Sequence, residues 1–404
     1  MRSSVVMLIA VVGGYFAYHL WFAPEEETEA QTEFVVDPAA ADESDGDSES
    51  LIDGSEGTED GFGQNRPDLR IGPTSRDDAH LGSDSPGGGP SDSEKRAASA
   101  QQRRENAAWK LYTKLKAARN ASQREDSKKL AQQIQSRFEG TDAARMLLFE
   151  RGRAALQRYE ELGRTPEGYV AAQEARKLLT PALFISSEIV DPDQRDDLRV
   201  RLRELADDLL FSGRAVDGVS YIFRTRPGDT LDVLCRKVFP KKWTVRVAPG
   251  LVMSINGIRR PQDLRAEVNI RVPRGAPAIV VVKSEFRLYF LLDGAYVRDW
   301  VVGLGAERSS TPVGNFEIRS KIRNPDWFPR QGVKIPYGNP RNILGTRWMG
   351  FRDTPGLSGF GIHGTTRPQS IGKKESSGCI RMRKNDVETL FGWTPRGAPV
   401  EIRR

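Results

Sequence analysis

The feature that most constrains this chain is an acidic, low-complexity stretch that separates a short apolar N-terminus from everything after it. Between residues 25 and 93 the sequence has 20 Asp and Glu against three Arg, a net charge of −17, and it ends in a Pro- and Gly-rich run from Ser85 to Pro90. Such a stretch buries too little apolar surface to offset its chain entropy, so we expect 25–93 to be a disordered acidic linker. Like charges extend it into a tether. The folded part of the 404-residue chain must therefore follow it.

The net charge of +6 hides this asymmetry, because the rest of the chain must carry about +23 to offset the −17 of the linker. A basic remainder is typical of proteins that bind nucleic acid, an anionic membrane surface or an acidic polymer. The sequence contains no nucleic-acid-binding motif, so we expect no nucleic-acid partner.

An apolar run from Val5 to Phe22 has about the length needed to cross a bilayer. Arg2 precedes it and an acidic run follows it, a charge bias that places the N-terminus in the cytoplasm and the rest of the chain outside it. We predict 1–24 to be an uncleaved transmembrane signal-anchor. A cleavable signal peptide is the alternative, but Tyr15 and Trp21 stand at the −3 positions where small residues are required.

Residues 94–217 have a helical pattern. Apolar side chains recur at i, i+4, i+7 and i+11 in Leu198, Leu202, Leu205 and Leu209. Gly140-Thr141 signals a helix stop followed by a cap, and Asp191-Pro192 signals the start of the last helix. Short helices in hairpins with Ala-rich contacts resemble tetratricopeptide-type repeats. We expect this α-helical region to serve as a spacer or to dock on its neighbours, with the recruitment of a protein partner as the alternative.

A further small segment, 220–274, begins at Tyr221, continues through Pro227-Gly228-Asp229-Thr230-Leu231 and closes at Ile270-Arg271-Val272-Pro273. These residues resemble a LysM module, a βααβ unit that binds carbohydrate. The family's Gly-Gln before the closing strand is Ala266-Glu267 here. The resemblance implies a shallow groove for N-acetylglucosamine chains, with contacts carried over to Gly228, Asp229, Thr230 and Ile258. Cys235 lies in a helical apolar run, where we expect a buried small hydrophobe.

Residues 277–404 have a mostly-β pattern. Two apolar stretches, Phe286 to Leu292 and Ala295 to Val302, flank a short turn and predict a hairpin. The segment from Asn324 to Thr346 is long for a loop in a compact domain, and loops of this length are usually functional. We expect it to fold over a cleft and form one wall of a substrate site.

The same region contains the only histidine available to a folded site. The chain has three His and two Cys, and His19 lies in the apolar run while His80 lies in the acidic linker. A period of two places His363 on one face of a strand, and the same period places Cys379 and Arg381 on one face of another. Cysteine-based acyl transfer needs a thiolate beside an imidazole, because a thiol alone is mostly protonated at neutral pH. A core Cys and an incidental His are the alternative interpretation.

Three motifs in this region occur together: Thr311 to Phe316 (Thr-Pro-Val-Gly-Asn-Phe), His363-Gly364-Thr365, and Ser376 to Arg381 (Ser-Ser-Gly-Cys-Ile-Arg). They resemble the motifs of the L,D-transpeptidase family, the YkuD-type catalytic domain, over roughly Ala278 to Ile402. Many members have His directly before the Gly-Cys pair, where this chain has Ser377. That difference affects the hydrogen bonding around the cysteine and the preference for an acceptor.

The resemblance implies a mechanism. Cys379 is expected to attack a peptide carbonyl after His363 takes its proton, and the carbonyl of Gly364 is expected to orient the imidazole. Arg381 is expected to pair with a substrate carboxylate, for which a planar guanidinium is suited. Backbone N–H groups of Cys379 and Gly378 would stabilise the oxyanion. Further substrate contacts are expected from Ser376, Ser377, Gly378, Thr365, Trp348 and Tyr337, with the two serines alternatively bonding only the turn.

The implied substrate is a peptidoglycan tetrapeptide stem, cut after its diamino acid and joined to an amine acceptor through a cysteinyl thioester. The implied location is the bacterial cell envelope, anchored in the inner membrane with the bulk in the periplasm or cell wall. Two alternatives stay open: a non-catalytic peptidoglycan-binding scaffold, and an L,D-carboxypeptidase that uses water as acceptor. No cofactor is expected. No metal site is expected either, because one folded His and two separated Cys fall short of the three or four ligands of a zinc site.

Overall fold

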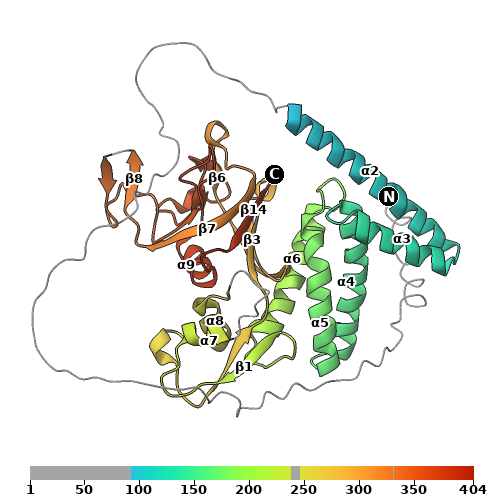
Figure 1. Ribbon diagram of the computed structural model, residues 1–404, viewed down its shortest axis with the longest axis horizontal. Coiled ribbons are helices and arrows are strands. Elements are labelled where there is room, and N and C mark those ends of the chain that lie inside the picture. The colour runs from blue at the N-terminus through green and yellow to red at the C-terminus, as the bar shows by residue number, and fades with distance from the viewer. Residues whose placement is uncertain (1–91, 238–245, 331) are drawn as a thin grey trace, which may run out of the picture. The chain divides into compact units, whose positions relative to one another are not determined.

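The computed structural model describes residues 92–237, 246–330 and 332–404 (Figure 1). Within these ranges no helix combines the length and the apolar character needed to span a bilayer. The predicted signal-anchor, 1–24, lies outside them, and so does the predicted acidic linker except for its last two residues, which begin the first helix at Asp92. Both stay predictions.

Internal contacts divide the chain into two compact units. Of the described residues, Lys116–Ser127 belongs to one unit, and 92–115 with those from Lys128 onwards belong to the other. The second unit contains the β-sheet, the helices that pack on it and every residue of the candidate site.

The N-terminal part of the described chain is helical, as predicted. Its helices are α2 (Asp92–Asn120), α3 (Arg124–Arg137), α4 (Asp142–Leu162), α5 (Pro166–Leu179) and α6 (Pro192–Ala206), with a 3₁₀ turn at Thr180–Phe184 and a π turn at Asp207–Phe211. Thr141 accepts a hydrogen bond from the N–H of Ala144 at the start of α4, and Asp191 accepts one from Asp193 at the start of α6. Because such caps satisfy N–H groups that have no partner within the helix, the two predicted helix starts are confirmed.

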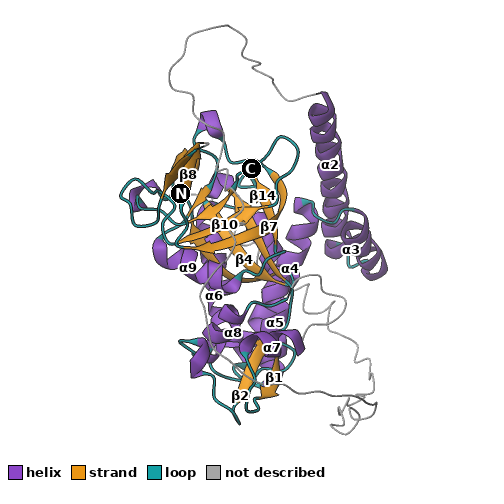
Figure 2. Ribbon diagram, turned by 60° about the vertical axis from the view of Figure 1, so that its left-hand side comes forward, coloured by secondary structure: helices purple, strands orange, loops and turns teal. Residues whose placement is uncertain are grey.

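The C-terminal part is an eight-stranded mixed sheet with the strand order β13-β11-β10-β7-β14-β3-β4-β5 (Figure 2). Its strands are β3 (Pro277–Val282), β4 (Arg287–Leu292), β5 (Ala295–Val301), β7 (Gly314–Arg323), β10 (Arg347–Phe351), β11 (Gly361–His363), β13 (Ile380–Arg381) and β14 (Pro399–Arg403). Most neighbours are antiparallel, whereas β14 with β3 and β11 with β13 are parallel. The predicted hairpin is β4–β5, which pairs Leu292 with Ala295, and it is confirmed.

Smaller elements complete this part. They are β6 (Leu304–Gly305) paired in parallel with β12 (Lys374–Ser376), β8 (Trp327–Arg330) paired antiparallel with β9 (Val333–Ile335), and α9 (Lys384–Trp393). The segment 324–346, predicted as a long loop, therefore contains a hairpin. Gly332 supplies its turn at φ 77°. The buried amide of Asn342 donates to the carbonyls of Pro325 (2.9 Å) and Ile335 (3.2 Å) and ties the hairpin to the rest of the segment.

The helical region docks on the sheet. Residues of α5, α6 and the sheet strands belong to one buried hydrophobic core, and α6 lies against β5, the last strand at one edge of the sheet. Charged contacts strengthen this packing: Arg195 and Arg199 both pair with Glu285, and Arg203 pairs with Asp299 at 2.8 Å. Docking on a neighbour, one of the two roles predicted for the helices, is therefore what α5 and α6 do.

A strand–helix–helix–strand segment lies between the helices and the sheet in sequence. It consists of β1 (Ser220–Arg224), α7 (Leu231–Lys237), α8 (Pro249–Asn256) and β2 (Asn269–Pro273). β1 and β2 pair antiparallel, from Ser220 with Pro273 to Arg224 with Asn269. The order is the predicted βααβ, while the identity of the segment as a LysM module stays a prediction. Cys235 is 5% exposed, so it is buried as expected.

The βααβ segment is fixed to both of its neighbours. The guanidinium of Arg271 donates to the carbonyls of Leu210 and Arg214 at the end of the helical region, at 3.2 and 2.7 Å. On the other side, the indole N–H of Trp393 donates to Ser254 Oγ at 2.8 Å.

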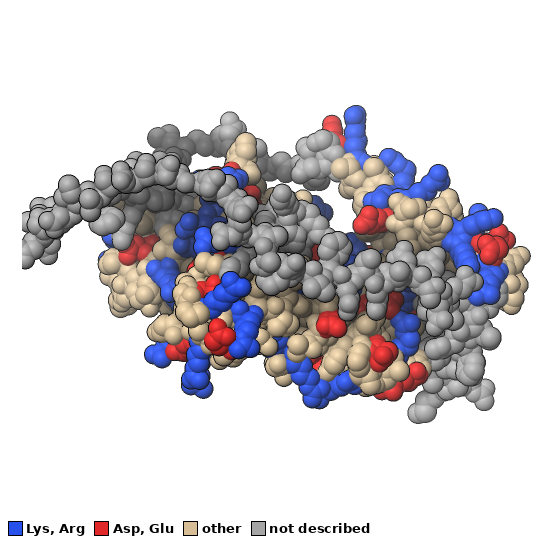
Figure 3. Space-filling view, turned by 60° about the horizontal axis from the view of Figure 1, so that its bottom comes forward, with Lys and Arg blue, Asp and Glu red and all other residues tan. Residues whose placement is uncertain are grey.

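On the face shown in Figure 3, basic side chains are interspersed with acidic ones and form no single basic patch.

We predict that Gly250→Ala destabilises the protein whereas Gly392→Ala does not. α8 approaches α9 so closely that a Cβ on Gly250 would lie 2.6 Å from the carbonyl carbon of Gly392, whereas a Cβ on Gly392 would lie 3.8 Å from Cα of Gly250. Overpacking of this kind costs about 1–3 kcal/mol, while alanine inside a helix gains about 0.5–1 kcal/mol over glycine. Thermal unfolding of both variants measures the difference, and equal melting temperatures would contradict the close approach of the two helices.

Candidate active site

The candidate site is built by the parallel pairing of β11 with β13. Ile362 pairs with Ile380 and His363 with Arg381. Both isoleucines are fully buried in the core, so the alternate residues His363, Cys379 and Arg381 share the opposite face. Neighbouring strands lie about 4.8 Å apart and rise about 3.3 Å per residue, which places the Cα atoms of His363 and Cys379 about 8 Å apart.

His363 is held by backbone groups. Its side chain is buried, and Nδ1 lies 2.5 Å from the carbonyl oxygen of Gly364. A carbonyl only accepts hydrogen bonds, so we assign the ring proton to Nδ1, which leaves Nε2 as the proton acceptor. Burial and, to a smaller extent, the charge of Arg381 lower the pKa of His363 to about 4, against hydrogen bonds to the backbone of Gly364 and Leu344 that raise it. The resting imidazole is therefore neutral.

Cys379 is also buried, at 4% exposure. Its Sγ donates to the carbonyl of Gly359 at 3.7 Å. Burial raises the pKa of the Cys379 thiol to about 11, opposed by a backbone hydrogen bond from Gly361 and by the charge of Arg381. The thiol is therefore protonated at rest and donates to Gly359, while the imidazole of His363 keeps its lone pair.

The turn before Cys379 is held by Ser376. This side chain is buried, donates to the carbonyl of Cys379 at 2.5 Å and accepts from the N–H of Gly378 at 3.2 Å. Of the two roles predicted for it, the structure gives it the hydrogen bonds of the turn. Ser377, which stands where many relatives of the motif have His, is exposed.

The glycines beside the reactive residues leave little room for a side chain. Gly378 has φ 106°, and a Cβ there would lie 2.5 Å from the ring of Phe360. A Cβ on Gly364 would lie 3.1 Å from the carbonyl oxygen of Leu344. Side chains at either position would disturb the groups that hold the thiol and the imidazole.

Arg381 is a buried cation without a protein partner. It is 8% exposed, and within the described residues its guanidinium makes no hydrogen bond or ion pair. Burial lowers its pKa, as does the charge of Arg367, while Cys379 and Glu375 raise it. Burying a charge is costly unless it is paired, so this position favours the binding of an anion.

The other predicted contacts lie in different surroundings. Trp348 is 1% exposed and stacks on His363, with ring centroids 5.8 Å apart. The hydroxyl of Thr365 accepts from the N–H of Arg367 at 2.9 Å. Tyr337 is 44% exposed on the segment that contains the β8–β9 hairpin. The structure thus brings Trp348 to the reactive pair, but beneath it rather than at the surface.

Sequence reasoning missed two groups that touch the cysteine turn. The carbonyl of Gly359 accepts from the thiol, and Ser309 Oγ donates to the carbonyl of Ser376 at 3.1 Å. Neither has a sequence signal of its own. Ser309 lies between β6 and the Thr311 motif. The pairing of β6 with β12 brings this segment to the cysteine turn.

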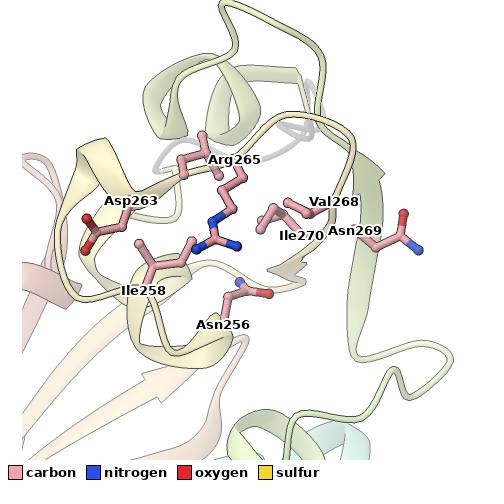
Figure 4. Close-up of a pocket in the computed structure, with 8 residues that line it drawn as sticks. Asn256, Ile258, Asp263, Arg265, Val268, Asn269 and Ile270 are labelled. Carbon is pink, nitrogen blue, oxygen red and sulfur yellow. The ribbon is translucent and has the colours of Figure 1, made fainter.

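The predicted glycan contacts lie elsewhere. A pocket of about 230 Å³ opens in the βααβ segment and is lined by Asn256, Ile258, Asp263, Leu264, Arg265, Val268, Asn269 and Ile270 (Figure 4). Ile258 belongs to this lining, whereas Gly228, Asp229 and Thr230 do not. Across the described ranges, no group of three or more His, Cys, Asp and Glu side chains is arranged to hold a metal ion.

Comparison with known proteins places this site in a family. The model of the YkuD L,D-transpeptidase catalytic domain matches residues 276–402. YqjB of Bacillus subtilis strain 168, named as an L,D-transpeptidase, is 39% identical over 130 residues, which are 32% of this chain and 72% of that protein. YcfS of Escherichia coli K12, also named as an L,D-transpeptidase, is 31% identical over 31% of this chain and 43% of that protein. A crystal structure of an L,D-transpeptidase from Mycobacterium tuberculosis H37Rv aligns with 35% of this chain and 74% of that one, at 18% identity and a TM-score of 0.27.

We predict that alkylation of Cys379 by iodoacetamide accelerates about tenfold per pH unit and levels off only near pH 11. The thiolate is the nucleophile, and burial raises the pKa of this thiol to about 11. The rate is measured in a Cys235→Ser variant, because burial raises the pKa of the Cys235 thiol to about 12 and its reaction would overlap at high pH. Circular dichroism at each pH controls for unfolding, and a plateau below pH 8 would contradict a neutral resting thiol.

Proposed function

This chain belongs to the L,D-transpeptidase family, and from that premise we propose that its site joins peptidoglycan stem peptides through a thioester on Cys379. The family's enzymes are cysteine-based, and the chain is an L,D-transpeptidase acting in peptidoglycan cross-linking. The observation that carries the residue assignment is the β11–β13 register, which puts the thiol, the imidazole and an unpaired cation on one face.

The first half-reaction forms the acyl-enzyme. Nε2 of His363 takes the thiol proton as Cys379 Sγ attacks the carbonyl carbon of the diamino acid in a tetrapeptide stem. The resulting oxyanion is held by the backbone N–H of Cys379, since that of Gly378 already donates to Ser376. The tetrahedral intermediate collapses, the C–N bond breaks, and the imidazolium gives its proton to the departing D-amino acid.

The second half-reaction transfers the acyl group. An amine acceptor attacks the thioester, His363 takes the proton of that amine, and the C–S bond breaks to return the thiol. An L,D-carboxypeptidase would use water in the same step, so the acceptor decides between the two activities. Throughout, the carbonyl of Gly364 keeps the proton on Nδ1 and so leaves Nε2 able to accept the thiol proton.

Arg381 gives the site its preference for an anionic substrate. Arg381 is 8% exposed and its guanidinium has no partner among the described residues, so a bound carboxylate would replace the hydration that burial removes. The basic side chain of Arg367 adds to the positive potential at this position. We propose that Arg381 binds a carboxylate of the stem peptide.

The βααβ segment is proposed as a LysM module that binds the glycan strand. Supporting this are its element order and its Pro-Gly-Asp-Thr turn, in which a carboxylate oxygen of Asp229 accepts from the N–H of Arg226 at 2.8 Å. Gly228, Thr230 and Ile258 are the further proposed contacts. We also propose that the chain is held in the inner membrane by its apolar N-terminus and works in the periplasm or cell wall, with the binding of a protein partner as the alternative role of the helical region.

Cys379→Ala is expected to abolish cross-linking of purified muropeptides, with the matched variant Cys235→Ala retaining it. Both cysteines are buried to the same degree, so the pair separates loss of the nucleophile from loss of a buried thiol. Products are read by mass spectrometry, which also distinguishes a cross-linked stem from a trimmed one. Unchanged cross-linking by Cys379→Ala would favour the non-catalytic scaffold.

Arg381→Gln is expected to raise KM for a tetrapeptide donor at least tenfold without lowering the melting temperature. A hydrogen bond to a charged group contributes about 1.5–3 kcal/mol, whereas an unpaired buried charge does not stabilise the fold. Arg383→Gln is the control, because Arg383 lies two residues further along and is exposed. A large loss of thermal stability with KM unchanged would instead make Arg381 a structural residue.

A further inference from the structure

Beneath the imidazole lies an aromatic ring whose position is set by the pairing of β10 with β11. Trp348 pairs with His363, and two residues along the same face Gly350 pairs with Gly361. Met349 and Ile362, which alternate with them, are fully buried on the core face. A tryptophan and a histidine therefore stand side by side, followed by two residues without side chains.

The glycine pair makes room for the indole. A Cβ on Gly350 would lie 2.5 Å from Ser320 Oγ and 2.8 Å from Trp348 Nε1. A Cβ on Gly361 would lie 2.4 Å from the carbonyl oxygen of Met349 and 3.1 Å from Trp348 Cη2. Contacts under 3.0 Å force the neighbouring atoms to move, so a side chain at either position would crowd the indole and the backbone beside it. The two glycines thus let the indole lie flat along the strands, and we call this space the glycine slot.

In the glycine slot the indole faces the imidazole. The planes of the Trp348 and His363 rings are inclined by 29°, and their centroids are 5.8 Å apart. Trp348 also belongs to a buried cluster with Leu344 and Cys379. The same ring therefore stacks on His363 and shares a buried cluster with Cys379.

The indole contacts His363 through the face of its ring and not through a hydrogen bond from Nε1. Within the described residues Nε1 has no hydrogen-bond partner. At 1% exposure the ring is also closed to a ligand, so direct contact with substrate does not account for it. The remaining interaction of Trp348 at the site is the packing of its aromatic face against the imidazole of His363.

We propose that Trp348 is a positioning residue for His363, which holds the plane of the imidazole and stabilises its positive charge while His363 carries the proton of Cys379. The inference rests on the proposed function, because it concerns the same base. A cation beside an aromatic face is attracted by the ring quadrupole, and more strongly where water is excluded. Such stabilisation matters here because burial and Arg381 both disfavour the imidazolium.

The test compares Trp348→Leu, which keeps an apolar side chain but has no aromatic face, with Trp348→Phe, which keeps the face and has no N–H. Trp393→Leu is the matched control, since Trp393 is buried in α9 and packs on Phe290 and Phe211 away from the reactive pair. Each variant is measured for kcat and KM with a tetrapeptide donor, for the rate of Cys379 acylation by a carbapenem, and for melting temperature.

We expect Trp348→Leu to lower kcat and the acylation rate about tenfold, with KM within about twofold. Trp348→Phe should retain most of the activity because the missing N–H has no partner. Trp393→Leu should keep the kcat of the wild type even if its melting temperature falls as far as that of Trp348→Leu. Gly350→Ala, whose added Cβ would lie 2.8 Å from Trp348 Nε1 and 2.5 Å from Ser320 Oγ, should lower acylation as Trp348→Leu does by crowding the ring without removing it.

Other results would overturn the inference. Full kcat in Trp348→Leu would remove the positioning role, and a rise in KM at constant kcat would indicate a substrate contact instead. Equal losses in Trp348→Leu and Trp393→Leu would indicate a general effect of stability. A wild-type protein that neither cross-links stem peptides nor is acylated would contradict the proposed function and the positioning role together. An active wild-type protein whose Trp348→Leu variant keeps the same kcat and acylation rate would contradict the positioning role alone.

Discussion

The site depends on one short parallel pairing, that of β11 with β13. Only two residue pairs define it, and it is reinforced at its ends: the N–H of Met382 donates to the carbonyl of His363 at 2.9 Å, and Gly303 and Arg381 exchange two backbone hydrogen bonds of 2.8 Å. A slip of one residue would turn Cys379 into the core and Ile380 toward the base. The buried isoleucines on the core face make that slip costly, so apolar packing on one side fixes the chemistry on the other.

The same burial sets the protonation state of the reactive pair. Removal from water raises the pKa of the Cys379 thiol to about 11 and lowers that of the His363 imidazole to about 4. A thiolate–imidazolium pair is therefore unfavourable at rest, and the proton must move as the sulfur attacks. The groups that reduce this cost are the carbonyl of Gly364, which accepts from the ring, and the aromatic face of Trp348. Arg381 acts in both directions, because it favours the thiolate and disfavours the imidazolium.

Much of this site can be predicted from the sequence, because its signals are local. The alternation around His363 and Cys379 gives their common face, and the caps at Thr141 and Asp191 give the starts of two helices. What the sequence does not contain is register between distant strands. Trp348 looks like a cleft residue until its pairing with His363 places it beneath the base, and the hairpin within 324–346 depends on the buried amide of Asn342, which no periodicity reveals.

The placement of the helices follows from the same sheet. The reactive strands form one edge, and β5 forms the other. An uncovered edge strand presents unpaired backbone groups to other chains. Here α6 and the π turn that follows it lie against β5, with Arg203 of α6 on Asp299 and Asp207 of the turn on Arg298. Asp299 is fully buried and also pairs with Arg287, so removing either arginine would leave part of a buried charge unmatched. Docking of α6 therefore closes the edge far from the cysteine, whereas the edge strand β13 is bound through Arg381 to the backbone of Gly303.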